Sequence, residues 1–477
     1  MGNSRPNLGQ SSASAPSSFY AETGRHLRLA GRANSADERD QRFALLEPDL
    51  DMIDGPWVNV GHEHDGHYWN FRRKKRIPVY VAANAPIRPK IEKVLPGTSS
   101  KFACWILADR TSSRLKELGW SRMWKTLPLE KFVEHALKQR YAEEGEALWA
   151  KYVDLRTEVC GQILPWIQRN EPNLSDHGVD HIQNVITNVA QLLGLPRAYG
   201  GEADWATPAG YCEHDMLLLL FGCLTHDVGN ILGREKHNQA ITTALGLAGG
   251  GWAQLPIGDR LIIERIGRAH SGKSSDGDRD TLGELAMQPA FFANHPVRPV
   301  EVAAVLRFAD ELAEGPQRTS KALLALTRHA STPSAMQIGD SSLLYHFYAA
   351  ISSYNIDHAG GRILIDYNVD RESADYGSDP VAREATIRDL LSMTFQRALK
   401  VNAERQYARH YSQALSRFRE TSISLRFNAN GRPLHRLDRT VTISDARTAF
   451  EGGVTLDRLD PRFAIDAVMD SLKQEDA

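Results

Sequence analysis

Apolar residues recur at helical spacing through the middle of the chain. Between residues 177 and 193 they fall three and four positions apart, which predicts an amphipathic helix. The stretch MLLLLFGCLTHD at 216–227 is apolar on nearly all sides, as is typical of a helix buried at the centre of a domain. The same spacing predicts one or two long helices over 129–167 and single helices over 299–314 and 382–417.

Capping and turn residues give these helices approximate ends. Asp176 or Ser175 can cap the start of the helix that begins near position 177. Asp215 can cap the buried helix, because an aspartate there precedes the apolar run directly. Gly315 can end the helix that begins at 299.

Strands are predicted mainly towards the C-terminus. The runs RILIDYNV at 362–369, TSISLRF at 421–427 and TVTIS at 440–444 alternate apolar and polar residues or are rich in β-branched ones. Two short β-prone runs, IPVYVAA at 77–83 and FACWILA at 102–108, lie nearer the N-terminus. The chain therefore has a helical centre with β-containing parts on both sides.

Composition divides the chain into four regions. Ser, Ala, Asn and Gly dominate residues 1–45, which we expect to form a disordered arm. Residues 46–125 predict a small α/β lead-in, and residues 126–330 predict a helical core. Residues 331–477 predict an α+β region with a long helix. The expected fold is mainly α, with a helical core and smaller α+β elaborations at both ends.

Charge and cysteine content exclude several classes of protein. The formal net charge of −2 gives no overall basic field for bulk nucleic-acid or membrane binding. The four cysteines form no CxxC pair, so neither a disulfide framework nor a thiolate zinc site is expected. The longest apolar run, Met216–Phe221, is too short to span a bilayer, and the N-terminus lacks the apolar core of a signal peptide. We therefore expect a cytoplasmic protein without a membrane partner.

Histidines and aspartates at inward-facing helical positions form the candidate chemistry. His181 lies beside the apolar stripe of its helix, and His226 and Asp227 end the most apolar helix. Asp310 follows Leu306 by one turn and so also faces inward. A buried carboxylate is costly unless a positive group meets it, and imidazole with carboxylate suits divalent metals. These four residues are the predicted ligands of one or two ions of Mg, Mn, Co, Fe or Ni; the alternative is histidines in surface or capping positions.

This order of residues resembles the HD superfamily of phosphohydrolases, which has an all-helical fold. The motifs that carry the resemblance are HGVDHIQNV (177–185), LTHDVGN (224–230) and RFADELAE (307–314), within roughly residues 165–320. The dipeptide His-Asp alone is unspecific, since it also occurs at 64–65 and 214–215. What is specific is His-Asp-Val-Gly at the end of a buried helix, between a histidine helix and an Ala-Asp helix.

The resemblance also implies roles for three further histidines. Some HD enzymes hold two metals bridged by the Asp of the pair, so that Asp227 would bridge and His237 and His270 would bind the second ion. Others hold one metal and use such histidines on the phosphate. His177, one turn before His181, can reach the same cleft as a proton donor or phosphate contact. The alternatives are polar-loop histidines at 237 and 270 and a first-turn surface residue at 177.

Five cationic residues are candidates for contacts with substrate phosphates. Arg307 and Arg318 lie near the Asp310 helix, and a guanidinium matches phosphate bidentately. Lys400 and Arg405 lie on the predicted 382–417 helix, where the alternative is an ordinary exposed face. Lys273 belongs to GRAHSGKS, which fits the phosphate-loop pattern; the flanking residues favour neither the strand nor the helix that this loop requires. Lys273 is therefore expected to contact phosphate only within the metal cleft.

Together these features predict a metal-dependent hydrolase of nucleotide phosphoesters. The first choice is a deoxynucleoside triphosphate triphosphohydrolase, similar to stand-alone HD hydrolases of bacterial antiviral systems, that releases nucleoside and triphosphate. Bacterial enzymes of that kind often carry a second His where this chain has Asn230, and the Gly-Tyr-Pro signature of HD cyclic-dinucleotide phosphodiesterases does not occur. The alternatives are a phosphodiesterase or nuclease acting on cyclic or oligonucleotides, and a nucleotide-sensing module without turnover. By the same resemblance we expect a homo-oligomer regulated allosterically by a nucleotide effector.

Overall fold

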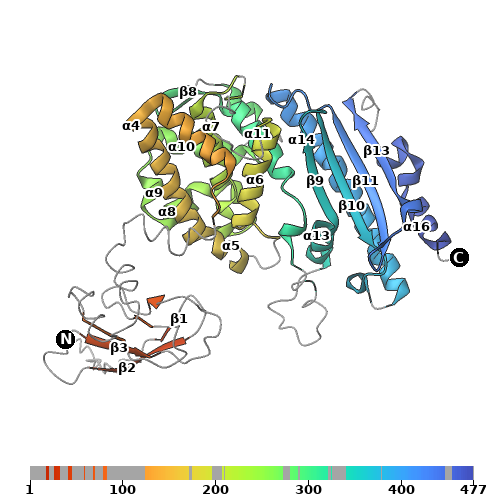
Figure 1. Cartoon of the computed structure of the whole chain (residues 1–477), viewed down its shortest axis with the longest axis horizontal. Coiled ribbons are helices and arrows are strands. Elements are labelled where there is room, and N and C mark those ends of the chain that lie inside the picture. The colour runs from red at the N-terminus through yellow and green to blue at the C-terminus, as the bar shows by residue number, and fades with distance from the viewer. Residues whose placement is uncertain are drawn as a thin grey trace, which may run out of the picture. The chain divides into compact units, whose positions relative to one another are not determined.

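The computed structural model describes residues 124–170, 175–195, 207–208, 210–271, 280–287, 290–320, 324, 340–377, 379–445 and 454–475, together with short strands nearer the N-terminus. The chain divides into two compact units, Met1–Arg122 and Met123–Ala477. The second unit contains the whole of the predicted helical core, 126–330, and of the predicted C-terminal region, 331–477. Mainly helical structure with small sheets confirms the predicted fold class (Figure 1).

The N-terminal unit contains an antiparallel sheet with the order β1-β2-β3-β6. Its strands lie at Ser18–Tyr20, His26–Arg32, Gln41–Leu45 and Val79–Ala82; β4 (Val58–Asn59) pairs with β5 (Tyr68–Trp69). Three of these strands fall within residues 1–45, the range for which the composition predicts a disordered arm. The strand predicted over 77–83 is confirmed by β6, and the run at 102–108 lies outside the described residues.

Helix α7 (Glu213–Thr225) lies at the centre of the helical core. Helices α4 (Pro128–Glu158), α6 (Val179–Leu192), α10 (Ile257–Ala269) and α11 (Pro299–Glu311) all contact it (Figure 1). Every residue of α7 is buried, as its apolar sequence predicts. Burying one leucine stabilises a fold by about 1.5–3 kcal/mol. The buried helix α7 therefore holds the residues at its C-terminal end in a fixed position.

The segment Glu213–Leu232 is long and apolar enough to cross a membrane by length and composition, but 89 % of its most apolar stretch lies inside the structure. The core helix of a folded domain passes the same test. The apolar residues of this segment contact the neighbouring helices of the core.

The start of α7 differs from the prediction in one detail. Cys212 is the capping residue, and its Sγ accepts a hydrogen bond from the Asp215 amide at 3.4 Å. In return Asp215 Oδ2 accepts from the Cys212 amide at 3.0 Å, so Asp215 is the third residue of a capping box. Its other oxygen accepts from the Arg298 amide at 2.7 Å. Asp215 therefore ties the starts of α7 and α11 together.

The other predicted helix ends lie within a few residues of the observed ones. Gly178 is the capping residue of α6, and Asp176 accepts a hydrogen bond from its amide at 2.7 Å. Helix α11 ends before Gly315, whose φ of +147° suits only glycine. The stretch predicted as one or two long helices forms α4 and α5 (Leu164–Asn170), joined by the π-helical turn Val159–Ile163.

The C-terminal part is a mixed sheet covered on one face by helices. Strand β10 (Arg362–Asp370) pairs in parallel with β11 (Glu420–Ala429) and antiparallel with β9 (Ser352–Asp357). Strands β12 (Arg432–Pro433) and β13 (Arg439–Ser444) pair antiparallel with β11. Alternate residues of β10 and β11 are buried, as a sheet with one covered face requires. The three strands predicted here are confirmed.

Helix α14 (Pro380–Tyr411) makes the crossover between the parallel strands β10 and β11. It ends before 417, the predicted limit, because Ser412 adopts an extended backbone. One side of α14 contacts β11 and another contacts α11, where it lies beside the helical core (Figure 1). Helix α14 therefore packs against both the C-terminal sheet and the helical core.

The remaining elements are short. The helices are α8 (Ile241–Ala248), α9 (Gly250–Ala253), α13 (Asp340–Ile351), α15 (Leu456–Leu459) and α16 (Ile465–Gln474), and β7 (Ala290–Phe292) pairs with β8 (His295–Val297). Single 3-10 turns occur at Val228–Leu232, His237–Gln239, Gly283–Met287, Pro316–Arg318, Ala374–Tyr376, His435–Leu437 and Pro461–Phe463.

Candidate metal centre

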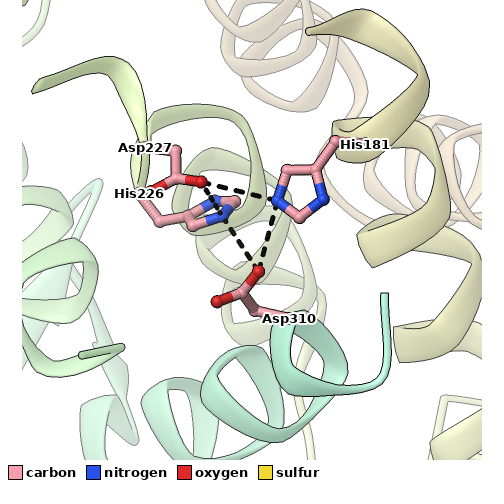
Figure 2. A group of neighbouring side chains, drawn as sticks. All are labelled: His181, His226, Asp227 and Asp310. Carbon is pink, nitrogen blue, oxygen red and sulfur yellow. Dashed lines mark ion pairs between the residues drawn. The ribbon is translucent and has the colours of Figure 1, made fainter. Parts of the chain in front are cut away.

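Four side chains from three helices converge at the C-terminal end of α7 (Figure 2). His181 comes from α6, Asp310 comes from α11, and His226 and Asp227 follow the last turn of α7. The Nε2 atom of His181 lies 3.5 Å from Asp227 Oδ2 and 3.2 Å from Asp310 Oδ1. The Nε2 atom of His226 lies 3.4 and 3.5 Å from the same two oxygens. The four ligand atoms lie within 4.8 Å of one another, a spacing at which one ion can bind them all.

Hydrogen bonds show which nitrogen of His226 is free to bind a metal. Its Nδ1 atom donates to the Cys223 carbonyl at 2.9 Å, and a carbonyl oxygen only accepts, so Nδ1 carries the proton. The Nε2 lone pair of the neutral ring then points at the Asp227 and Asp310 carboxylates, where it has no hydrogen-bond partner among the described residues. Lone pairs facing carboxylates repel unless a cation lies between them. A backbone carbonyl on the second ring nitrogen is also the usual arrangement around a metal-binding histidine.

Burial and charge determine the pKa values of this group. Burial alone would lower the pKa of His226, but Asp227 and Asp310 together outweigh it and raise that pKa to about 10. Burial would likewise raise the pKa of Asp227, but the facing histidines, His226 above all, hold it well below its usual range. The pKa of Asp310 is lowered in the same way, with His181 and His226 opposing the effect of burial. A proton therefore occupies the place of the cation in the metal-free protein.

A second group of ligands faces the other oxygen of Asp227. His237 Nε2 lies 3.4 Å and His270 Nε2 lies 3.6 Å from Asp227 Oδ1. Their Nδ1 atoms donate to the carbonyls of Arg234, at 3.0 Å, and Gly267, so both Nε2 lone pairs face the carboxylate. These atoms also lie within 4.8 Å of one another. Asp227 thus stands between two ligand groups, one on each oxygen, as a bridging carboxylate does.

Glycine at position 229 makes room for the second group. A Cβ atom there would lie 1.9 Å from the His237 carbonyl oxygen. The chain after Asp227 therefore passes the His237 turn at a distance that only glycine allows. Asn230 follows, fully buried, and donates to Asp227 Oδ1 at 3.0 Å. The motif LTHDVGN thus contains the ligands His226 and Asp227, the glycine that lets the His237 turn approach, and the Asn230 amide that orients Asp227.

His177 is buried beside the centre, so the alternative of a surface residue is wrong. Its Nδ1 atom bonds the Ser175 carbonyl, and its Nε2 atom accepts from Arg318 at 2.7 Å. That Nε2 atom lies 3.7 Å from Asp227 Oδ2. Burial, followed by the nearby Arg318 charge, lowers the pKa of His177 well below its usual range. The neutral ring orients Arg318 and does not carry a spare proton at Nε2.

A polar cleft of about 320 Å³ opens at the metal centre. Arg307, Arg318 and Lys400 line it, as predicted, whereas Lys273 lies outside the described residues. Arg405 does not line the cleft: it is fully buried, where it donates to Asp445, Asn402, Thr421 and the Phe418 carbonyl. Arg405 is therefore part of the α14–sheet packing, and its prediction as a substrate contact is corrected.

The structure adds cleft residues that were not predicted. They are Arg234, Ser271, Glu311, Glu314, Tyr345, Arg397 and Glu404. Two of the cations had a signal in the sequence. Arg397 precedes Lys400 by three residues on one helix and so shares its face. Arg234 precedes His237 by three residues, inside a motif of which only the histidine was considered.

Of the five Lys and Arg residues that line the cleft in the described ranges, four are paired with carboxylates. Arg307 contacts both oxygens of Glu404, at 2.7 and 2.9 Å. The other pairs are Arg318 with Glu314 at 3.2 Å, Lys400 with Glu311 at 2.7 Å, and Arg397 with Glu311 and Glu314 at 3.3 and 3.1 Å. In the part of the chain that the structure describes, Arg234 is the cleft cation without such a carboxylate.

The chain is similar to a known protein family over part of its length. A family model described as HD-CE matches residues 171–400. Comparisons with curated proteins and with solved structures find no match. The matched range contains all six histidines and aspartates of the two ligand groups, together with His177, and it extends to Lys400 on α14. The match indicates an HD-type domain within residues 171–400, and the buried His/Asp cluster there fits a metal-dependent phosphohydrolase.

Proposed function

We propose that this chain hydrolyses a phosphodiester bond of a cyclic or linear nucleotide at a centre of two divalent metals. The observation that carries the proposal is the position of Asp227, whose Oδ2 faces one ligand group while its Oδ1 faces another. A carboxylate in this position would be shared by two ions, one held by each ligand group. Bound ions of this kind supply Lewis acidity and a nucleophile at neutral pH.

The chain's own residues hold and orient this centre. His181, His226 and Asp310 would hold one ion, and His237 and His270 would hold the other, with Asp227 shared. Backbone carbonyls fix three of the four imidazoles with Nε2 towards the centre. Four nitrogen ligands among six side chains favour Mn, Fe, Co or Ni over Mg, which prefers oxygen.

The charge of the cleft supports a substrate with few negative charges. Among the described residues, five cationic side chains and five carboxylates line the cleft, and four of the cations are paired with three of the carboxylates. The described Lys, Arg, Asp and Glu side chains of the cleft therefore sum to no net charge, and bound metals would add positive charge to it. A phosphodiester carries one negative charge at the scissile phosphorus, whereas a triphosphate needs several cations to be released from their partners.

A deoxynucleoside triphosphate triphosphohydrolase is the second candidate. It is favoured by the three predicted phosphate contacts that do line the cleft, Arg307, Arg318 and Lys400. Release of these cations from their carboxylates on substrate binding would provide the charge that a triphosphate requires.

A single experiment separates the two candidates. Purified protein is loaded with Mn, Co, Fe or Ni and incubated with cyclic dinucleotides, short oligonucleotides, dNTPs and NTPs, and the products are identified by mass. Mononucleotide or a linearised dinucleotide supports phosphodiester hydrolysis. Nucleoside with inorganic triphosphate supports the second candidate. Absence of any product with every metal would contradict both.

A further inference from the structure

Arg234 lies on a short loop between two elements of the metal centre. The 3-10 turn Val228–Leu232 precedes it and the turn that begins at His237 follows it. Gly233 and Lys236 have positive φ values of 111° and 58°, and a positive φ is uncommon for lysine. The Arg234 carbonyl accepts the hydrogen bond from His237 Nδ1 at 3.0 Å. The backbone conformation that aims His237 at Asp227 therefore also brings the Arg234 side chain to the cleft.

The side chain of Arg234 differs from the other cleft cations in its partners. Its guanidinium lies 3.4 Å from His177 Nε2, a neutral atom that already accepts from Arg318 at 2.7 Å. One lone pair cannot accept two good hydrogen bonds, so the contact with Arg234 is the weaker. Arg234 is exposed, whereas Arg307 and Arg318 are largely buried in carboxylate pairs. Its donors are accordingly available to a ligand in the cleft.

The cost of recruiting each cation separates Arg234 from the rest. To bind phosphate, Arg307 would leave both oxygens of Glu404 without their partner in a mostly buried place. Arg234 gives up one long contact to a neutral ring. A guanidinium can then offer two parallel donors to two phosphoryl oxygens, which a phosphate accepts well.

We infer that Arg234 is the residue that binds the phosphoryl oxygens of the substrate, and those of the phosphate product, beside the metal centre. This inference rests on the proposed phosphoester chemistry for its role in turnover, but binding of a phosphate anion can be measured without turnover. The ligand class is a mono- or dianionic phosphoryl group next to Asp227 and His237.

The test uses the metal-loaded, full-length protein and inorganic phosphate as the probe. Affinity for phosphate is measured by isothermal titration in wild type, Arg234→Gln, Arg234→Lys and Lys236→Asn. Lys236→Asn is the matched control, because it removes a positive charge from the same loop while asparagine tolerates the left-handed backbone there. Metal content is determined for each variant. Because Arg234 is exposed and its carbonyl is unchanged by substitution, we expect wild-type metal content and melting temperature.

Loss of one charge-assisted bidentate contact should weaken phosphate binding about 10- to 100-fold in Arg234→Gln. Arg234→Lys should recover part of the loss, and Lys236→Asn should bind within about twofold of wild type, since Lys236 is exposed, is not among the residues that line the cleft, and its charge is screened by salt. Wild-type affinity in Arg234→Gln, an equal loss in Lys236→Asn, or no phosphate binding by the wild type would overturn the inference.

Hydrolysis of bis(4-nitrophenyl) phosphate is measured on the same samples. If no phosphoester is hydrolysed but phosphate binding still depends on Arg234, the proposed function fails and the phosphate site stands. If turnover occurs and Arg234→Gln changes neither turnover nor phosphate affinity, the site fails and the proposed function stands.

Discussion

The two sides of Asp227 are built differently. On the Oδ2 side the ligands are His181, His226 and Asp310, which come from packed helices, and both imidazoles are fully buried. On the Oδ1 side the ligands are His237, from a turn with positive-φ residues beside it, and His270, at the end of α10. The His237 side chain is 15 % exposed. We call these the helix side and the loop side of the centre.

This difference bears on how each side binds a metal. Helices packed around α7 hold the helix-side ligands in place before any ion arrives, so little ordering entropy is lost on binding. The loop side depends on a short turn that opens to the cleft. We therefore expect the helix side to bind its ion more tightly and the loop side to exchange its ion more readily with solvent.

The largest effect is expected from Asp227, the residue shared by both sides. Asp227→Asn keeps the size of the side chain but removes the charge that both ligand groups face. Turnover should fall by at least about 10³-fold, since charge stabilisation by metals is worth several kcal/mol. Metal content should fall on both sides, as measured by elemental analysis of dialysed protein. Full occupancy of both positions in this variant would show that Asp227 is not the bridge.

The next prediction separates the two sides directly. His270→Ala should leave about one metal per chain, held by the helix side, whereas His181→Ala should weaken the tighter position. In the wild type, a chelator should remove metal in two phases, with the faster one missing from His270→Ala. If the wild type holds one metal and His270→Ala keeps it, the loop-side histidines act on phosphate or protons instead.

Asn230 offers a smaller change that acts through Asp227. Its buried amide donates to Oδ1, the oxygen that faces the loop side, at 3.0 Å. Removal of a residue that orients a metal ligand commonly costs about 10- to 100-fold in metal affinity. Asn230→Ala should therefore weaken loop-side binding by that factor in competition with a fluorescent chelator, and helix-side binding by much less. Equal loss on both sides would show that Asn230 stabilises the whole turn.

A change of pH should alter metal affinity on the helix side more than on the loop side. The pKa of His226 is about 10 in the metal-free protein, so a helix-side ion must displace a proton at neutral pH. Affinity there should rise about tenfold per pH unit from pH 7 towards 10. On the loop side, burial lowers the pKa of His237, so that ring is already neutral at pH 7. Loop-side affinity should change little over the same range, as titrations at fixed ionic strength would show.

The same groups set the stability of the metal-free protein. The folded pKa of His226 is raised, so its stabilising contribution is complete below the unfolded pKa of about 6.5 and is lost as pH rises towards 10. The lowered pKa values of Asp227 and Asp310 stabilise above about pH 3.9, and that contribution is lost as pH falls. The melting temperature without metal should accordingly decline from pH 6.5 to 10. A rise over that range would contradict the assigned charge pattern.

The helix side was predictable from the sequence and the loop side only in part. His181 and Asp310 belong to helices whose apolar stripes already show which face is inward, and His226 ends a helix whose apolar sequence predicts burial on all sides. His237 and His270 lie at a turn and at a helix end, where no periodicity fixes direction, so their place beside Asp227 came from the family resemblance. Arg234 precedes His237 by three residues, but the orientation of its side chain depends on positive φ values nearby that the sequence does not predict.

Helix α14 shows a second limit of periodicity. Lys400 and Arg405 were both predicted to contact phosphate from one helix. Lys400 does line the cleft, whereas Arg405 packs against the sheet. A helix that contacts α11 on one side and β11 on another has two inward faces, and spacing alone cannot assign a residue to one of them. The carboxylates opposite these cations come from elements far apart in sequence, so their pairing was also beyond prediction.

The smallest effect is expected from Ser271, at the edge of the loop side. Its hydroxyl lies 3.5 Å from His237 Nε2, the outer limit of a hydrogen bond, and a typical neutral bond is worth about 1 kcal/mol. Ser271→Ala should therefore change loop-side metal affinity and turnover by less than about fivefold. Because the helix side has no contact with this hydroxyl among the described residues, its affinity should stay at the wild-type value. A change larger than that of Asn230→Ala would mean that Ser271 is itself a ligand or a substrate contact, and the loop side would then be more polar and more adaptable than its two histidines indicate.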